Sequence, residues 1–209
     1  MTPMHARSTT LHGDPGSVAA ATAFVRDEVM PAVRDMPGCV GLSMLADGGS
    51  GRCIVTTSWQ DEDAMRASRE GVAAYAARTA DVLGGEPQLE EWEIAAMHRV
   101  LESQQAARSR VTWLRTEPDA VHRAVDAVRL SLMPKLDDLP GFCSVSIMVR
   151  RAEGLAVAAI SYDSQAHAEA AAEGAREFRD AFAPTMGIEV VDTAEFDVPI
   201  AHLRVPETI

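Results

Sequence analysis

The chain has 209 residues, of which 47% are apolar and 24% carry charge, a composition typical of an ordinary soluble globular protein. Its formal net charge of −12 argues against binding to nucleic acid or to an anionic membrane surface, because both favour clustered lysine and arginine. Neither a signal peptide nor an apolar run of about 20 residues is found, so we expect a cytoplasmic protein that does not bind membranes.

The first strand is expected over residues 7–12. The turn at residues 13–16 (GDPG) begins a helix, because the first helical turn does not use the donor that proline lacks. Apolar residues then recur at three- and four-residue spacing, so this helix should bury one face. Pro31 lies past its middle and should kink or split it before Pro37-Gly38 ends it.

Two alternating strands follow, over residues 39–46 and 52–59, and the turn at residues 47–51 (DGGSG) is typical of a hairpin. This glycine-rich turn does not lead into a helix, so it does not indicate a phosphate-binding loop. We expect a second helix from Asp61, which would cap it, and a last strand over residues 88–98.

The same pattern returns about 103 residues later. Met36-Pro37-Gly38 has its counterpart in Leu139-Pro140-Gly141, and Glu70-Gly71 in Glu173-Gly174. The second copy predicts a helix kinked at Pro134 and another capped at Asp163. Its expected strands include residues 110–115, 155–162 and 188–202. The polar segment 101–108 is expected to be a linker, which gives two domains, residues 1–100 and 101–209.

A strand-helix-strand-strand-helix-strand order is that of the ferredoxin-like fold, in which both helices cover one face of an antiparallel sheet. The other face is also apolar in both copies, and one domain alone cannot cover it. We therefore predict an α+β protein of two tandem ferredoxin-like (βαββαβ) domains. They would pack sheet to sheet as an intramolecular dimeric α+β barrel. Whether this pseudo-dimer is monomeric or forms a higher homo-oligomer stays open.

Three cysteines, Cys39, Cys53 and Cys143, lie in apolar strands. They match neither a metal-ligand spacing nor an even disulfide framework. We expect them to be buried, reduced thiols, and we predict no metal site.

The order of elements resembles antibiotic biosynthesis monooxygenase (ABM) domains, members of the dimeric α+β barrel superfamily, in two tandem copies. The Pro-Gly entry into each second strand, and Trp59 before an acidic-capped helix, carry this resemblance. It implies a ligand cleft in each domain, between the sheet and its two helices. It also implies activities that include cofactor-independent oxidation of quinols or polyphenols and oxidative heme degradation, besides cases with no known reaction.

The heme-degrading members pair a tryptophan at the end of the third strand with a histidine two to three turns into the next helix. Trp59 matches, but residues 61–83 contain no histidine. In the second copy Tyr162 replaces the tryptophan, and His167 comes too early. We therefore expect neither heme degradation nor a bound cofactor.

A cofactor-independent oxygenase needs a dry cavity and a base that ionises a phenol or an activated C–H group, and histidine is the usual base near neutral pH. His98 and His202 occupy matching positions on the last strands. His122 and His167 occur only on the helices of the second copy. All four are candidate bases, and a solvated or structural role is the alternative for each.

Large aromatic side chains suit the walls of a cleft for a planar ligand, although the protein core uses them as well. The candidates are Trp59, Tyr162, Tyr75, Phe178, Trp92 and Trp113. The sequence thus predicts a cofactor-independent monooxygenase acting on a small aromatic, quinol or polyketide-like compound. The alternative is a non-catalytic small-ligand-binding or structural module of the same fold.

Overall fold

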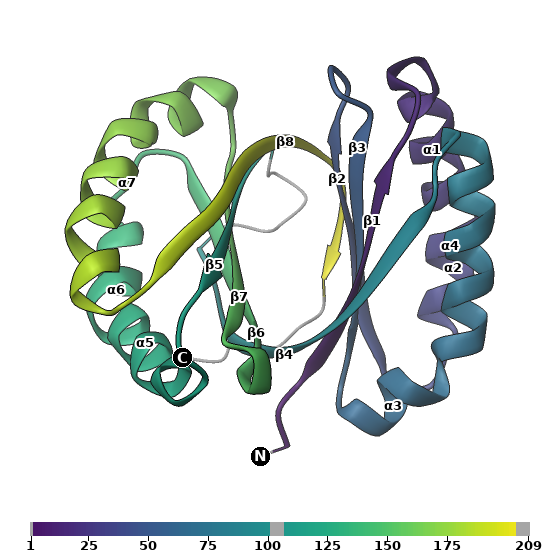
Figure 1. Cartoon of the computed structure of the whole chain (residues 1–209). Helices are drawn as coiled ribbons and strands as arrows, with labels where there is room; N and C mark the ends of the chain where they lie inside the picture. The colour runs from purple at the N-terminus through teal and green to yellow at the C-terminus, as the bar shows by residue number, and fades with distance from the viewer. Residues whose placement is uncertain (1, 101–106, 204–209) are drawn as a thin grey trace. The chain divides into compact units, whose positions relative to one another are not determined.

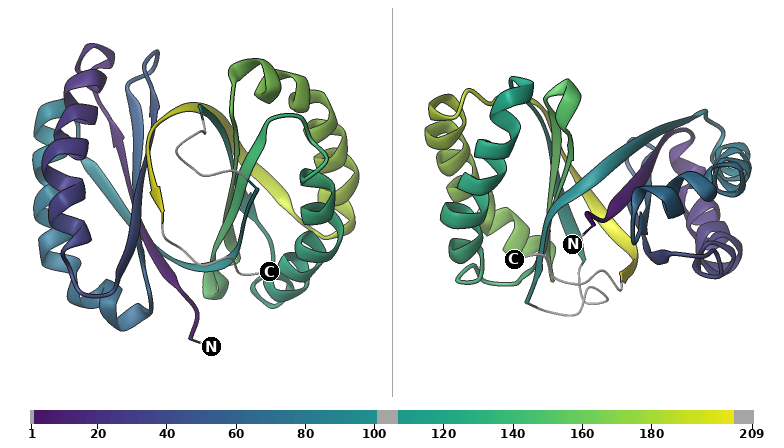
Figure 2. Two further views of the ribbon diagram at one scale, coloured as in Figure 1. Left: turned by 180° about the vertical axis from the view of Figure 1, so that it is seen from behind. Right: turned by 90° about the horizontal axis from the view of Figure 1, so that it is seen from below.

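The computed structural model describes residues 2–100 and 107–203, apart from the side chains of residues 178, 179 and 203 (Figure 1). The chain divides into two compact units. The first unit runs to Glu93 and includes the strand end that starts at Asp197, and the second contains Ile94–Phe196. In each unit the helices cover one face of a sheet (Figure 2).

Both halves of the chain have the predicted order of elements, and the fold is ferredoxin-like and α+β. The first half contains β1 (His5–His12), α1 (Val18–Phe24), α2 (Met30–Arg34), β2 (Cys39–Asp47), β3 (Arg52–Trp59), α3 (Glu62–Ala67), α4 (Arg69–Leu83) and β4 (Pro87–Arg99). The second half contains β5 (Arg108–Arg115), α5 (Val121–Ala127), α6 (Met133–Leu136), β6 (Phe142–Arg150), β7 (Leu155–Tyr162), α7 (Gln165–Thr185) and β8 (Glu189–Leu203). The packing of the two sheets into a barrel stays a prediction.

The sheet of the first unit has the strand order β4-β1-β3-β2-β8, and neighbouring strands are antiparallel. The sheet of the second unit has the order β8-β5-β7-β6-β4. The division into units falls inside β4 and β8, which have 13 and 15 residues and are therefore long enough to serve two sheets. The predicted boundary between residues 100 and 101 adjoins residues 101–106, which lie outside the described part of the chain, and it stays a prediction.

The first helix of each half passes through a five-residue π-helical segment, Val25–Val29 or Val128–Leu132, before its Met-Pro pair. The sequence predicted a kink or a break at Pro31 and Pro134. The structure divides the helix at a wider, π-helical segment just before each Met-Pro pair, and the helix resumes as α2 or α6. The wider turn accommodates proline. Proline has no backbone N–H, and at this irregular point its absence does not remove a regular α-helical hydrogen bond.

The second helices begin at side-chain caps. Asp61 Oδ1 accepts a hydrogen bond from Ala64 N at 2.8 Å, as the sequence predicted. In the other half the cap is Ser164, whose Oγ accepts from His167 N at 3.3 Å. The prediction of Asp163 as the cap is wrong by one residue, because its carboxylate contacts the His167 ring instead.

The three cysteines are free thiols in the structure. Cys53 and Cys143 are buried as predicted, but Cys39 is half-buried, since it opens its strand directly after the Pro-Gly turn. Burial raises the pKa of all three thiols, and that of Cys53 reaches about 11. None of the helices in residues 2–100 and 107–203 combines the length and hydropathy that a membrane span requires.

Candidate functional site

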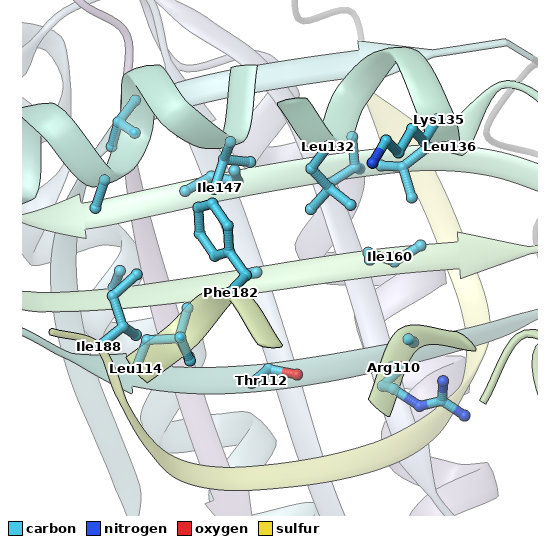
Figure 3. Close-up of a pocket in the computed structure, with 18 of the residues that line it drawn as sticks. Arg110, Thr112, Leu114, Leu132, Lys135, Leu136, Ile147, Ile160, Phe182 and Ile188 are labelled. Carbon is cyan, nitrogen blue, oxygen red and sulfur yellow. The ribbon is translucent and has the colours of Figure 1, made fainter. Parts of the chain in front are cut away.

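The second unit contains a cavity of about 440 Å³ between its sheet and its helices (Figure 3). This volume is in the range of small-molecule sites, roughly 300 to 1,000 Å³. Strands β5, β6 and β7 form its floor, and α5, α6 and α7 its other walls. Most of the lining is aliphatic or aromatic, as illustrated by Leu114, Leu132, Ile147, Ile160, Phe182 and Ile188.

Small residues on α7 leave the room for this cavity. Ala171, Gly174 and Ala175 line it, and a Cβ added to Gly174 would meet no other atom within 4 Å. At the equivalent position of the first unit, a Cβ on Gly71 would lie only 2.8 Å from the terminal methyl carbon of Met36. The space that is open above Gly174 is therefore occupied by a side chain above Gly71.

Arg110 of β5 lies at one end of the cavity (Figure 3). Only 10% of its side chain is exposed. Its Nε and Nη2 donate to Glu195 Oε1 at 3.2 and 2.5 Å, and Nη2 also reaches the Ala168 carbonyl at 3.3 Å. Within the described residues, Nη1 donates no hydrogen bond.

The first unit has the same arginine with all its partners. Arg7, 1% exposed, donates from Nη2 to the Met65 carbonyl at 2.7 Å and to Glu91 at 2.9 Å. Its Nη1 donates to Ser68 Oγ at 3.0 Å. The residue equivalent to Ser68 in the second unit is Ala171. The second unit has therefore lost the acceptor that satisfies Nη1 in the first.

Tyr162 of β7 also lines the cavity and is 1% exposed. Its hydroxyl makes no hydrogen bond with a described residue. Burial raises the pKa of this hydroxyl, and the nearby Arg110 cation partly offsets that effect. Its first-unit counterpart Trp59 is satisfied, because Nε1 donates to Thr57 Oγ1 at 3.1 Å. Ile160, the counterpart of Thr57, offers no such acceptor.

The charged residues that line the cavity are all cationic, although Arg110 is paired with Glu195 and Arg115 lies 3.9 Å from Glu189. The ionisable lining residues other than Tyr162 are Arg110, Arg115 and Lys135, and no aspartate or glutamate lines the cavity. In a chain whose net charge is −12, this distribution is distinctive. The cavity thus combines an apolar body with hydrogen-bond donors and positive charge at its edges.

A sequence model described as antibiotic biosynthesis monooxygenase matches residues 4–80. Two uncharacterized proteins of Mycobacterium tuberculosis H37Rv, Rv2558 and Rv2557, are 44% and 41% identical to this chain. Each match covers 99% of this chain, and 88% and 92% of the relatives respectively. The chain belongs to the antibiotic biosynthesis monooxygenase (ABM) family.

Solved structures share the ABM fold. An anthrone oxidase-like protein matches with a TM-score of 0.66 and 14% identity, over 96% of this chain and 91% of that chain. A monooxygenase-like protein from Listeria innocua matches with a TM-score of 0.58 and 8% identity, over 94% and 95% of the two chains. At such low identities these similarities concern the fold alone.

None of the four histidines proposed as bases for ABM chemistry is among the residues that line this cavity. His122, on α5, has a side chain that is 79% exposed and pairs with Asp126 at 3.0 Å. His167 lies on α7, one turn before lining residues Ala170 and Ala171. Its Nδ1 is 2.6 Å from Asp163 Oδ1, and hydrogen bonds from His167 and Ser164 lower the pKa of that carboxyl.

The other two histidines lie on the last strands, as the repeat predicted. His98 Nε2 is 2.6 Å from Asp137 Oδ1, and its ring stacks on Phe142 with centroids 6.2 Å apart. His202 pairs with Leu42 in the sheet of the first unit. The structure therefore does not bring the four candidates together.

Among the six aromatic candidates, Tyr162 lines the cavity. Trp59 and Trp92 are buried and donate to Thr57 and Ser8 respectively. Tyr75 is half-buried in the first unit and packs against the Arg78 guanidinium, Trp113 is half-buried on β5, and the side chain of Phe178 lies outside the described residues.

Sequence reasoning missed Arg110 as a site residue, and it did not include Phe182 among the six aromatic candidates. A signal for Arg110 was present, because the alternation of β5 places Arg110, Thr112 and Leu114 on one face. Arg7 occupies the equivalent position of β1 in the first copy, so both copies have an arginine on the strand face that is turned toward the helices. In the described part of the chain, no group of three or more histidine, cysteine or acidic side chains is arranged to hold a metal ion.

Proposed function

We propose that this ABM-family protein is a cofactor-independent monooxygenase that oxidises a small aromatic, quinol or polyketide-like compound in the cavity of its second unit. The observation that carries the proposal is the 440 Å³ cavity with its largely apolar lining. It lies between sheet and helices, where the family resemblance implies a ligand. A flat hydrophobic molecule suits such walls.

The reaction balances without a cofactor. An activated methylene group, as in an anthrone, loses a proton to a base and becomes a carbanion. The carbanion gives electrons to dioxygen, and the sum is R₂CH₂ + O₂ → R₂C=O + H₂O. The substrate supplies all the electrons, one oxygen atom enters the product, and the other leaves as water.

His167, which lies beside the lining residues and not among them, is the base we propose for this step. It lies one turn before Ala170 and Ala171, at the start of the helix that lines the cavity. The contact of Nδ1 with Asp163 fixes the ring and leaves Nε2, which has no partner among the described residues, to take a proton. The proposal gives no role to His122, whose side chain is mostly in solvent.

Oxygen uptake tests the proposal directly. The protein would be mixed with 1,8-dihydroxyanthrone and a panel of naphthoquinols, and uptake compared with the rate without protein. We expect uptake above that rate, one labelled oxygen atom in the product when labelled dioxygen is used, and a loss of about 100-fold or more in His167→Gln. The matched control His122→Gln should keep the rate. Absence of uptake above background with every substrate would refute the oxygenase.

The second candidate is a non-catalytic small-ligand-binding module. It is favoured by the fact that no histidine, aspartate or glutamate is among the residues lining the cavity. In that case the same compounds bind and compete with one another for the cavity, but oxygen uptake stays at the background rate.

A further inference from the structure

Two donors at one end of the cavity have no partner among the described residues. Arg110 Nη1 and the Tyr162 hydroxyl belong to side chains that are 10% and 1% exposed, and neither makes a hydrogen bond with a described residue. Neither atom is sealed off from solvent, so both are open to the cavity, and a polar group in such a place is usually satisfied by water or by a ligand. Both residues line the cavity, so a molecule inside it is in a position to supply the missing acceptor.

Comparison of the two units shows that this polar end is specific to the second one. Ser68 accepts from Arg7 Nη1, and Thr57 accepts from Trp59 Nε1. Their counterparts are Ala171 and Ile160, and both of these line the cavity. The two substitutions that removed the internal acceptors thus coincide with the cavity itself.

The surroundings of this end favour an acceptor that carries negative charge. Glu195 neutralises Arg110 from the side of Nε and Nη2, but it also lies 3.6 Å from Arg108. Of the other ionisable groups of the lining, Lys135 is cationic, whereas Arg115 lies five residues farther along β5 and is 3.9 Å from Glu189. A carboxylate or phenolate oxygen accepts from a guanidinium more strongly than a neutral oxygen does.

We infer that the cavity of the second unit binds an apolar, ring-containing molecule that bears one anionic oxygen, and that this oxygen is held by Arg110 Nη1 and the Tyr162 hydroxyl. The shared chemistry is an oxyanion on a hydrophobic body, supplied either by a carboxylate or by an ionised phenol. The inference rests on the cavity of the proposed function and specifies its substrate class. It requires no turnover.

Matched ligands test the charge requirement. Fluorescence titration would compare anthracene-2-carboxylate with anthracene-2-carboxamide, which has the same ring system without the charge, and 4-nitro-1-naphthol would represent ionised phenols. We expect the carboxylate, the phenolate or both to bind at least about 10-fold more tightly than the amide. The stronger of the two identifies the source of the oxygen. Equal affinity for the amide and both anions would overturn the inference.

Substitution of the arginine tests the position. Arg110→Met should reduce anion affinity by about 10- to 100-fold and leave amide affinity within about 3-fold. Arg7→Met, which removes the equivalent arginine from the first unit, is the control and should leave both affinities unchanged. An anion preference that survives in folded Arg110→Met would assign it to Lys135 or Arg115 and overturn the inference.

Ala171→Ser keeps the test decisive if Arg110→Met does not fold. It restores the hydroxyl that accepts from the arginine in the first unit, so it should satisfy Nη1 internally and weaken anion binding several-fold without loss of stability. Ala172→Ser, one position away on α7 and outside the cavity lining, should not. Unchanged anion binding in Ala171→Ser would count against the inference.

Binding and oxygen uptake separate this inference from the proposed function. Oxidation of neutral quinols without any anion preference would refute the inference and leave the oxygenase standing. An anion preference that depends on Arg110, without oxygen uptake, would do the reverse.

Discussion

The terminal methyl carbon of Met36 lies 2.8 Å from the point where a Cβ on Gly71 would be. The helix glycine of the first unit thus lies in close packing, since the flexible side chain of Met36, two residues beyond the end of α2, occupies the space above it. Gly174 holds the same place in the repeat with nothing near it. One glycine therefore serves close packing in one unit and borders a cavity in the other.

Filling the cavity should separate ligand binding from stability. Gly174→Leu places a side chain in open space and replaces a helical glycine, so we expect the free energy of unfolding to rise by about 0.5 to 1 kcal/mol. Binding of anthracene-2-carboxylate should be lost, because the added side chain occupies the ligand's volume. Urea unfolding and fluorescence titration measure the two effects.

The matched variant Gly71→Leu should behave in the opposite way. Its side chain meets the flexible end of Met36, which can shift, so the expected cost is about 1 kcal/mol, at the low end for overpacking. Ligand binding in the second unit should persist. Equal changes of stability in the two variants would contradict the difference in packing described above.

The two partners of the Arg7–Glu91 ion pair should differ in how much stability is lost when each is replaced, because only Arg7 is fully buried. Glu91→Gln leaves the Arg7 cation 1% exposed without its carboxylate, and loss of one partner of a buried pair typically costs about 3 to 5 kcal/mol. Arg7→Met leaves Glu91 35% exposed and still paired with Arg69 at 3.0 Å, so it should cost less. Urea unfolding of the two variants checks the order, and an equal or reversed order would contradict it.

The lowered pKa of Glu91 predicts that the Arg7–Glu91 pair makes stability depend on pH. Burial raises the pKa of this carboxyl, but hydrogen bonds from Arg7 and Arg69 outweigh burial and lower it overall. The pair therefore contributes stability above the pKa of an unfolded glutamate, and that contribution is lost as the pH falls through the lowered value. Arg7→Met should make stability less dependent on pH in the acidic range, which acid titration of unfolding would detect.

The fold was predictable because local signals agree with one another. The return strands were expected over residues 52–59 and 155–162, and β3 and β7 have those bounds. Turn residues and strict alternation fix such strands without any information from the rest of the chain. The π-helical turn before Pro31 was not predictable in this way, since a kink, a break and a wider turn all satisfy proline.

The candidate site was harder to predict, because it depends on volumes that the two copies fill differently. The repeat gives Leu139 for Met36 and Ala175 for Val72, but no pattern of apolar residues says that the space between them stays open. His122 was chosen for its chemistry, although it follows Val121 and so lies off the apolar stripe of its helix. Arg110 was missed because the sequence analysis did not ask which residues pair with an arginine that alternates into the buried face of its strand.

Cys53 should make stability fall in the alkaline range. Its side chain is fully buried, and burial raises its pKa from 9.0 to about 11, with Asp47 adding to the effect. Below pH 9 the thiol is protonated in both states, so its contribution is complete. Between about pH 9 and 11 only the unfolded chain releases the proton, so stability drops by an amount on the order of 2 kcal/mol.

The variant Cys53→Ala isolates this effect, because alanine is the counterpart at Ala156 in the second unit. It should have a smaller loss of unfolding free energy between pH 8 and 11 than the parent chain, measured by urea unfolding at each pH. The two tyrosines, the single lysine and the other two cysteines are the same in both proteins, so their contributions cancel in the difference. Identical pH profiles would show that the Cys53 thiol ionises as easily in the folded chain as in the unfolded one.

Removal of the Tyr162 hydroxyl should cost little stability and yet weaken ligand binding. In Tyr162→Phe the aromatic ring keeps its packing, and the group removed has no hydrogen-bond partner among the described residues, so unfolding free energy should stay within about 0.5 kcal/mol or rise. Affinity for anthracene-2-carboxylate should fall, while affinity for the amide should not. The comparison is Thr57→Val, which leaves the buried Trp59 Nε1 without its acceptor and should cost about 1 to 3 kcal/mol without changing ligand affinity. A Tyr162→Phe variant as destabilised as Thr57→Val would mean that the hydroxyl serves the fold, and its role at the cavity would have to be abandoned.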